Sequence, residues 1–537
     1  MADEQQQRFE GIRSVAVIGA GISGIMATKY LLQAGLDVTV FERNKKPGGV
    51  WLYDEKKAAE PPYSATKPLE TAQALCPWYQ EANQQDGIVS AEDALRHAPP
   101  GACYEGLTNN FSLITIELKD LPWLWEIPMT TPECPDNACE WTTHRNILQY
   151  VQNAASHVGL EDRVQYCTLV ERVKKEGGKW QVTTGTLTST ASENTGEEMF
   201  QIRHRKREFD AIVVASGHYN TPRLPSIPGL LEWREAYPDR VEHSKSYRHP
   251  QQYAGKVRVS SLRKKKIWLM NKKNQKNILL VGAGTSSTEI ARELGPFVKK
   301  MYQSGRGSPF DLPLDFIPEN CHRIAEIESF GTLQNSIENA TTTEGHLPGE
   351  VTLKDGMILQ DIDIVIVCTG YHFAYPFLPE LHADDESANV DVSQVLVTNG
   401  SCTLNLHKDM FYIPDPTLAF VGISQFIATF SFFEFQAMFI ASVFSGKASL
   451  PKQEELRRIY EKRLAEKGDT RLMNGRQDEE VSYVDELVAQ INVINPTKPV
   501  EGFSAKWHAA RDAGKLQKIR ARFAREKAER EAKETTV

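Results

Sequence analysis

Two glycine-rich turns, each between an apolar run and a helix-like stretch, are the segments of this chain whose residue types and spacing best suit chemistry. The first contains Gly19, Gly21, Ile22, Ser23 and Gly24, and the second contains Gly282, Gly284, Thr285, Ser286 and Ser287. Glycines in such a turn let the backbone approach a pyrophosphate, which the N–H groups at the helix start then bind. The spacing predicts two dinucleotide-binding sites in one chain.

The residues beyond each turn differ in charge, so the two sites are expected to bind different dinucleotides. The strand predicted at 38–41 ends in Glu42, whose carboxylate suits the two ribose hydroxyls of an adenosine and repels a 2′-phosphate. The strand predicted at 298–302 leads instead to Ser304 and Arg306, with no acidic residue between. A hydroxyl and a guanidinium there suit the 2′-phosphate of NADPH.

The elements that position these turns are predicted to alternate between strand and helix, which implies a parallel sheet. A helix is expected at 144–158. Buried strands are expected at the apolar runs 14–18, 38–41, 211–215, 277–281 and 362–368. Since the second turn lies between the runs at 211–215 and 362–368, one domain is predicted to be inserted into another.

We therefore predict an α/β fold with two Rossmann-like dinucleotide-binding domains. The predicted parts are a first domain at 12–218 and 345–452, an inserted domain at 219–344, and a charged helical extension at 453–537. Within the first domain, residues 163–184 predict a hairpin, and the polar segment 186–198 predicts a solvated loop. In the extension, 454–467 and 504–533 predict solvated helices.

Composition narrows the class of protein. The 537 residues are 41% hydrophobic and 25% charged, as in an ordinary soluble globular protein, and the net charge of −8 argues against a general nucleic-acid binder. Residues 1–11 are polar and lack the apolar core of a signal peptide, so a cytoplasmic location is the expectation. The apolar stretch 420–444 contains Glu434 and Gln436, which favours a core helix over a membrane span. No CxxC pair occurs among the eight cysteines, so neither a disulfide framework nor a metal site is expected.

Further motifs, taken in order, resemble those of one known family. They are residues 47–51 (PGGVW), 104–110 (YEGLTNN), 216–219 (SGHY), 243–248 (HSKSYR) and 369–371 (TGY), together with both glycine turns. The set resembles the flavin-containing monooxygenases over roughly residues 14–452, with filamentous-fungal members most alike. Two positions depart from the family pattern: Asp239 stands where a glycine usually precedes His243, and Ser287 replaces the third glycine of the second turn.

The resemblance implies a cofactor at each turn, FAD at the first and NADPH at the second. It implies that NADPH reduces the flavin, that O2 then forms a flavin hydroperoxide, and that one oxygen atom passes to a small organic substrate while the site excludes water. Tyr247 resembles the branch that oxygenates nitrogen or sulfur, which includes tailoring steps in secondary metabolism. Baeyer-Villiger oxygenation of a ketone is the alternative.

The resemblance also assigns roles to residues outside the turns. Asn110 is the catalytic candidate, an amide near the flavin and the cofactor ribose that can both donate and accept; a turn-capping role is its alternative. Trp51 is expected at the flavin, or else only in the core. The other residues expected to bind a cofactor are Arg43, Gly49, Val50, Thr108, Val170, Thr369 and Gly370.

Two other classes of function stay open from the residues alone. A reductase that passes electrons to a disulfide would need a redox dithiol, which the cysteine spacing does not provide. A dinucleotide-binding protein that has lost turnover would keep both turns. For His243, ordering the segment between the domains is favoured over proton transfer. The sequence does not indicate an oligomeric state.

Residues 257–275 interrupt the approach to the second turn. They carry seven positive charges and no acid, with neither a helical nor a strand period. A nucleic-acid or nuclear-localisation patch is one interpretation. We favour a translated in-frame intron, because Val-Arg can be encoded by GTAAGA and a final Gln by CAG, while Leu-Met can contain CTAAT.

The intron hypothesis predicts messenger RNA in which codon 256 is joined directly to codon 276. Sequencing of reverse-transcribed message across this junction would detect it. A tryptic peptide spanning residues 267–272 (IWLMNK) in protein purified from its natural source would refute the hypothesis.

Overall fold

A mostly parallel sheet carries the first glycine turn. The computed structural model describes residues 6–123, 142–191, 198–254, 256–258, 268–270, 275–308, 310–333, 345–384, 391–476 and 479–512. Within these residues the sheet has the strand order β22-β23-β24-β9-β2-β3-β5. Its strands are β22 (Leu406–His407), β23 (Phe411–Tyr412), β24 (Leu418–Phe420), β9 (Ala211–Val214), β2 (Ser14–Ile18), β3 (Asp37–Phe41) and β5 (Val164–Gln165).

Both faces of this sheet are buried, as its continuous apolar runs predict. Successive side chains of β2 point to opposite faces: Val15 and Val17 pack with the helices, and Ala16 and Ile18 pack with a second sheet. The helical layer contains α1 (Ile22–Gln33), α4 (His144–Val158) and α7 (Thr429–Phe444). The helix predicted at 144–158 is thus confirmed.

The second sheet of this lobe corrects one expectation. Its order is β4-β8-β7-β6, with β4 (Gly87–Val89), β8 (Glu198–Phe209), β7 (Lys179–Ala191) and β6 (Thr168–Glu176). The solvated loop predicted at 186–198 is wrong for 186–191, because β7 continues through its polar residues while it pairs with β8. Residues 192–197 lie outside the described residues. Pairing between the strands, and not side-chain burial, holds this end of the sheet together.

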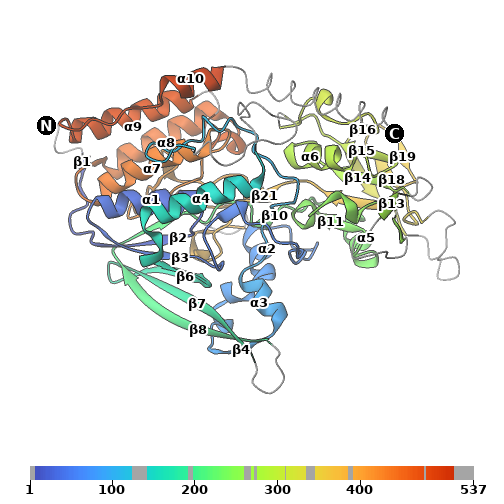
Figure 1. The fold of residues 1–537 in the computed structure, drawn as a ribbon, viewed down its shortest axis with the longest axis horizontal. Helices are drawn as coiled ribbons and strands as arrows, with labels where there is room; N and C mark the ends of the chain where they lie inside the picture. The colour runs from blue at the N-terminus through green and yellow to red at the C-terminus, as the bar shows by residue number, and fades with distance from the viewer. Residues whose placement is uncertain are drawn as a thin grey trace.

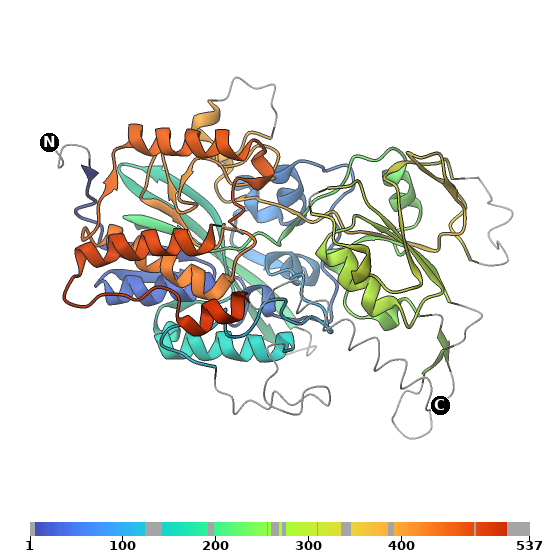
Figure 2. The same ribbon diagram turned by 90° about the horizontal axis from the view of Figure 1, so that it is seen from above.

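The inserted lobe is a second parallel sheet, and Figures 1 and 2 show it beside the first as the green-to-yellow part of the chain. Its order is β11-β20-β14-β15-β16. The strands are β11 (Val241–His243), β20 (Ile364–Val367), β14 (Asn277–Val281), β15 (Lys300–Ser304) and β16 (Cys321–Ile324). Helices α5 (Leu230–Ala236) and α6 (Thr285–Leu294) pack on opposite faces, and an antiparallel sheet of β17 (Ile327–Phe330), β18 (Val351–Leu353) and β19 (Ile358–Leu359) adjoins. The two Rossmann-like units of the predicted fold are confirmed.

Two short strands pair where the chain passes between the lobes. Strand β10 (Thr221–Pro222) leads out of the first lobe and pairs antiparallel with β21 (Tyr371–His372), which leads back. Since β18 and β20 belong to the inserted lobe, we place the return at β21, not near residue 345 as the sequence had indicated. A buried parallel strand does not by itself reveal which of two similar sheets it joins.

The C-terminal extension is less solvated than its composition predicts. Helix α8 (Gln453–Lys467) buries Leu456 and Tyr460, and α10 (Ala505–Asp512) buries Trp507. Helix α9 (Glu480–Ile494), which the sequence analysis did not predict, lies beside α7 (Figure 1), and its apolar residues pack in the same core. In α8 and α10 the apolar residues lie among many charged ones, whereas α9 contains three acidic residues and no Lys or Arg.

The remaining elements are short. Helices α2 (Pro68–Leu75) and α3 (Ala91–His97) flank the cavity described below, and β1 (Gln6–Gln7) pairs with β25 (Leu450–Pro451). In the basic insertion, β12 (Lys256–Arg258) pairs with β13 (Trp268–Met270). Residues 259–267 and 271–274 of the segment lie outside the described residues, and the intron hypothesis stays a prediction.

The apolar stretch at 420–444 forms the core helix α7. Its Glu434 is fully buried and accepts hydrogen bonds from Lys29 Nζ at 2.9 Å, Tyr30 OH at 2.7 Å and the Lys119 backbone N at 2.9 Å. These donors compensate the carboxylate for lost hydration. Across the described residues, no helix is both long and apolar enough to cross a membrane.

Removing the Glu434 carboxylate is expected to destabilise the first lobe. Glu434→Ala leaves the Lys29 ammonium without its buried partner, so the free energy of unfolding should fall by about 3 kcal/mol. Urea unfolding followed by near-ultraviolet circular dichroism would measure the change. Glu434→Gln, which keeps the side-chain shape, should cost less. Glu461→Ala on the exposed face of α8 is the matched control; an equal effect of both alanine variants would contradict the role of the buried pair.

Candidate cofactor and active site

Both glycine turns make the same close backbone contact. Gly19 has φ of +107°, and a Cβ added to it would lie 2.6 Å from the carbonyl oxygen of Ala215, just beyond β9. Gly282 has φ of +110°, and its Cβ would lie 2.7 Å from the carbonyl oxygen of Cys368, just beyond β20. A side chain at either position would collide with the neighbouring strand end. The two turns therefore have equivalent geometry in the two lobes.

The helix after each turn is free to bind an anion at its start. Within the described chain, neither α1 nor α6 has a side-chain cap or an acidic residue in its first turn. Their first N–H groups, with the positive end of the helix dipole, are suited to a pyrophosphate. The donor set thus fits a dinucleotide at each turn.

The third position of each turn packs the helix against the strand. At Gly24 an added Cβ would lie 1.9 Å from Gly19 O, so glycine is required. At the second turn the Ser287 side chain is accommodated, and its Oγ accepts a hydrogen bond from Gln303 Nε2 at 2.6 Å. The departure from the family pattern at Ser287 is therefore compensated by a partner on β15.

Glu42 has two roles: it holds the first turn in place, and its side chain lines the cavity beside that turn. Its Oε2 accepts a hydrogen bond from Ala20 N at 2.7 Å, and its Oε1 accepts from Asn44 N and Nδ2, both at 2.8 Å. A carboxylate has about four acceptor positions, so capacity remains for a ribose hydroxyl. Arg43 beside it donates from Nη2 to Asn220 Oδ1 at 2.5 Å, which ties the end of β3 to the segment between the lobes.

Gly49 lies close to Gly21 of the first turn, with no side chain between the two backbones. Gly49, with φ of +57°, begins a short 3-10 helix (Gly49–Trp51), and its Cβ would lie 3.0 Å from Gly21 Cα. Val50 is 39% exposed and lines the cavity, and Trp51 packs edge-on against Phe430 of α7 with ring centroids 6.4 Å apart. Where the flavin is expected, one wall of the cavity is therefore formed by apolar side chains and the other by glycine backbone.

The sequence left two roles open at this turn, capping the turn and facing the cofactors. In the structure Asn109 caps the turn and Asn110 lines the cavity. Asn109 is buried, accepts from Thr142 N at 2.6 Å and donates to Phe111 O at 2.5 Å, so it fixes the turn. Asn110 is exposed and lines the cavity. In the same segment, Tyr104 OH donates to Glu289 on α6 at 2.6 Å, which sets this segment against the second turn.

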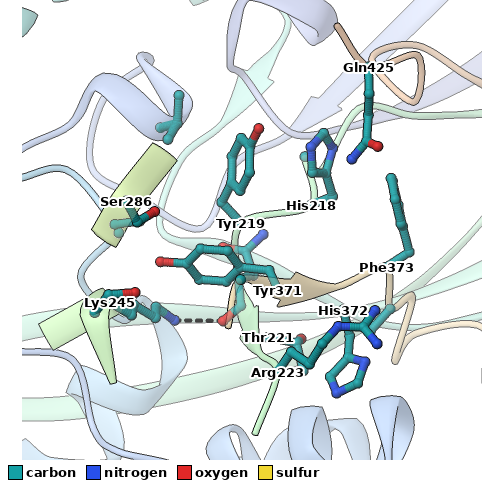
Figure 3. A pocket seen from close by; sticks show the side chains of 18 of the residues that line it. His218, Tyr219, Thr221, Arg223, Lys245, Ser286, Tyr371, His372, Phe373 and Gln425 are labelled. Atoms are coloured by element: carbon teal, nitrogen blue, oxygen red, sulfur yellow. Dashed lines mark hydrogen bonds between the residues drawn. The ribbon is translucent and has the colours of Figure 1, made fainter. Parts of the chain in front are cut away.

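One cavity of about 1890 Å³ joins the two turns. A drug-sized ligand occupies roughly 300–1,000 Å³, so this volume suits two dinucleotides and a substrate. All the predicted site residues line the cavity except Gly24 and Ser287, the two helix-packing positions. Figure 3 shows Ser286 and Lys245 on one side, Phe373 and Gln425 on the other, and Tyr219 and Tyr371 between them.

Arg223, Arg306 and Arg471 line one end of the cavity, where Arg471 is paired with Asp469. Arg306 is exposed and follows β15, and the Ser304 hydroxyl donates to Ala325 O at 3.0 Å. Burial, together with the nearby charges of Arg306 and Arg471, lowers the pKa of Arg223 to about 10. Three guanidinium groups therefore line this end, as an anionic phosphate would require.

His243 and Tyr247 are structural in this arrangement. Nδ1 of His243 accepts from Lys245 N at 3.1 Å, so its Nε2 carries the proton and donates to Gly370 O at 3.1 Å. Burial, with the charge of Lys245, lowers the pKa of His243 to about 3. Tyr247 is fully buried and donates to Glu293 on α6 at 2.7 Å, and it does not line the described cavity. Tyr247 is therefore placed to support the packing of α6 and not to contact a ligand in the cavity.

Several residues that line the cavity were not predicted from the sequence. Phe310 from the inserted lobe stacks on Phe426 of the first lobe, with ring centroids 5.7 Å apart. The extension contributes Arg471, Leu472, Gly475 and Glu479 to the wall. Its residues 474–476 pair with Gln425, since Gln425 N donates to Asn474 O at 2.8 Å and Arg476 N donates to Gln425 O at 3.1 Å. The contact is held by buried polar residues, Asn474 and Arg476, and no local pattern in the sequence indicated it.

Comparisons with known proteins agree with this geometry. A family model described as flavin-binding monooxygenase-like matches residues 112–312 and 334–500, and a model described as an NAD(P)-binding Rossmann-like domain matches residues 17–66. The chain is 35% identical to flavin-containing monooxygenase ustF2 of Aspergillus flavus, over 94% of this chain and 98% of the relative. It is 32% identical to ustF1 of the same fungus, over 93% and 89%. The solved structure of S-allyl-L-cysteine S-oxygenase from Allium sativum superposes with a TM-score of 0.61 at 22% identity, over 95% and 98%.

Replacing Arg306 is expected to weaken NADPH binding selectively. Arg306→Ala removes a charged contact to the 2′-phosphate worth about 1.5–3 kcal/mol, which corresponds to roughly a 10- to 150-fold rise in KM for NADPH. The KM for NADH should change little. Steady-state kinetics with both cofactors would measure this, with Arg205→Ala on the exposed face of β8 as the control. Equal losses for NADPH and NADH would show that Arg306 does not contact the phosphate.

Proposed function

This chain belongs to the flavin-containing monooxygenase family and is an NADPH-dependent flavin enzyme, and on that premise we propose that it inserts one oxygen atom from O2 into a nitrogen or sulfur atom of a small organic substrate. A tailoring step in secondary metabolism is the proposed setting. Baeyer-Villiger oxygenation of a ketone is the alternative outcome of the test below.

The observation that carries the proposal is the single cavity reached by both glycine turns. FAD at Gly19–Gly24 and NADPH at Gly282–Ser287 would share one continuous cavity, which direct hydride transfer between them requires. Asn110 and Val50 line the same space from the first lobe. A substrate that enters it would meet both cofactors.

The residues of the chain bind, orient and shield, while bound FAD supplies the oxygen-activating redox chemistry. The Asn110 amide can donate from Nδ2 and accept at Oδ1, so it can hold a reacting oxygen and a ribose hydroxyl at once. Asn109 keeps its neighbour in place through the bonds to Thr142 and Phe111. Rigid support of this kind is what an orienting group needs.

Apolar side chains from α7 and the loop before it exclude water at the flavin end. Ile427, Phe430 and Phe433 line the cavity there. Burial lowers the pKa of His218 to about 4, so at pH 7 this cavity residue is neutral and adds no charge beside the reacting atoms. A dry, uncharged surrounding protects a reactive oxygen species from hydrolysis.

The proposal is tested with purified protein, ¹⁸O2, NADPH and three probes: N,N-dimethylaniline, methyl p-tolyl sulfide and cyclohexanone. The protein should bind FAD, and mass spectrometry should find one ¹⁸O in the amine or the sulfide product. An ester formed from cyclohexanone would establish the Baeyer-Villiger alternative instead. NADPH oxidation that places no ¹⁸O in any probe, or in extracts of a fungal host, would contradict the proposal.

Asn110→Ala is expected to uncouple the reaction. FAD content and the rate of NADPH oxidation should stay near those of the unmodified protein, whereas product formation should fall by about 100-fold. The released H2O2 should account for the difference. Asn495→Ala, at an exposed position just after α9, is the control variant. Unchanged coupling in Asn110→Ala would remove this residue from the reaction.

A further inference from the structure

Lys245 is a buried lysine in the wall of the cofactor cavity, and no motif assigns it a role. The residue is 3% exposed, and its side chain reaches the cavity that joins the two glycine turns. Its Nζ donates to Asn220 O at 2.7 Å, the contact dashed in Figure 3. An ammonium has three N–H donors. Among the described residues Asn220 O is the one acceptor found for it, so donors remain for a group in the cavity.

The backbone of Lys245 is fixed at the edge where a dinucleotide binds. It follows β11, which pairs in parallel with β20, so its position lies at the carboxyl edge of the inserted sheet. Lys245 N donates to His243 Nδ1, and His243 Nε2 donates to Gly370 O beyond β20. In open parallel sheets the ligand lies outside this edge. Figure 3 places Lys245 on the same side of the cavity as Ser286 of the second turn.

The positive charges around Lys245 outnumber the negative one. Arg43 at the end of β3 and Arg248 from the same segment both oppose its ammonium, and Glu60 is the carboxylate that favours it. Glu60 is itself committed, since it accepts from the Ser246 hydroxyl and from His243 N at 3.0 Å. Among the described residues, the phenols of Tyr219 and Tyr371 also face this part of the cavity and His243 contacts Lys245; all three are neutral at pH 7.

We propose that Lys245 binds NADP(H) directly, by donating from its ammonium to a phosphate oxygen of the bound cofactor. A phosphate placed here would supply the missing negative charge and the missing acceptor at once. The inference rests on NADP(H) binding, which belongs to the proposed function. It adds a contact on the inserted sheet that is separate from the 2′-phosphate contact expected of Arg306.

This contact makes cofactor affinity depend on pH. Burial, with the charges of Arg43 and Arg248, lowers the pKa of Lys245 to about 7 in the free protein. A bound phosphate favours the charged ammonium and raises that pKa again. Below pH 7 the lysine is already protonated and binding is strongest. Above pH 7 the cofactor binds together with a proton, so the Kd should rise about fivefold from pH 7.0 to 8.0.

Calorimetric titration of the FAD-loaded protein with NADP⁺ tests the inference without turnover. At pH 8.0, experiments in buffers of different ionisation enthalpy should find close to one proton taken up per NADP⁺ bound. If the unmodified protein binds no NADP⁺, the proposed function fails. If it binds NADP⁺ without proton uptake, only the role of Lys245 is overturned.

Two variants separate Lys245 from other groups. Lys245→Met should bind NADP⁺ at least tenfold more weakly at pH 6.5, with no proton uptake and a Kd that does not change up to pH 8.5. Lys245→Arg, which keeps the charge at every pH, should bind with a pH-independent Kd near that of the unmodified protein at pH 6.5. Its outcome decides the test if the methionine variant fails to fold.

Lys206→Met on the exposed face of β8 is the matched control and should behave like the unmodified protein. Proton uptake that persists in both Lys245 variants would assign it to another group and overturn the proposal.

Discussion

The contact between a glycine and the end of the adjacent strand is the constraint on which both sites depend. Gly19 lies against the carbonyl of Ala215, and Gly282 lies against the carbonyl of Cys368, each with almost no space between. This contact lets the chain turn sharply from strand to helix, so the helix starts directly at the carboxyl edge of its sheet. The strand that provides the carbonyl then continues into the segment between the lobes. The position of each cofactor and the position of each crossing between lobes are thereby set by the same contact.

Buried polar groups then join the parts that these turns position. Glu42 ties the first turn to the end of β3, and His243 ties β11 to Gly370 beyond β20. Between the C-terminal extension and the first lobe, buried Asp409 accepts hydrogen bonds from Arg476 Nε at 2.5 Å and from Asn474 Nδ2 at 3.0 Å. These bonds attach the extension to the first lobe. Such groups are costly to bury unless all their bonds are made, so each favours one arrangement of its surroundings.

Local patterns predicted the elements well, and long-range packing was where prediction failed. The turns, β2, β3, α4 and the core helix α7 follow from residue type and period, because each is fixed by neighbours in sequence. The membership of β20 in the inserted sheet depends on which of two similar sheets an apolar strand joins, and no local signal decides that. The division of roles between Asn109 and Asn110 likewise depends on Thr142, 33 residues away from the first of them. Helix α9 has apolar residues and only three acidic ones, but nothing in its local sequence indicates that α7 is the helix against which it packs.

The attachment of residues 474–480 has a consequence for the order in which the enzyme is made. These residues follow, in the chain, nearly every other residue that lines the cavity, yet they hold Gln425 and the loop that ends at α7. Both Rossmann-like sheets can form on the ribosome before this segment has left the exit tunnel. The cavity wall is closed only afterwards. A nascent chain would therefore acquire its nucleotide-binding folds first and its complete cavity wall last.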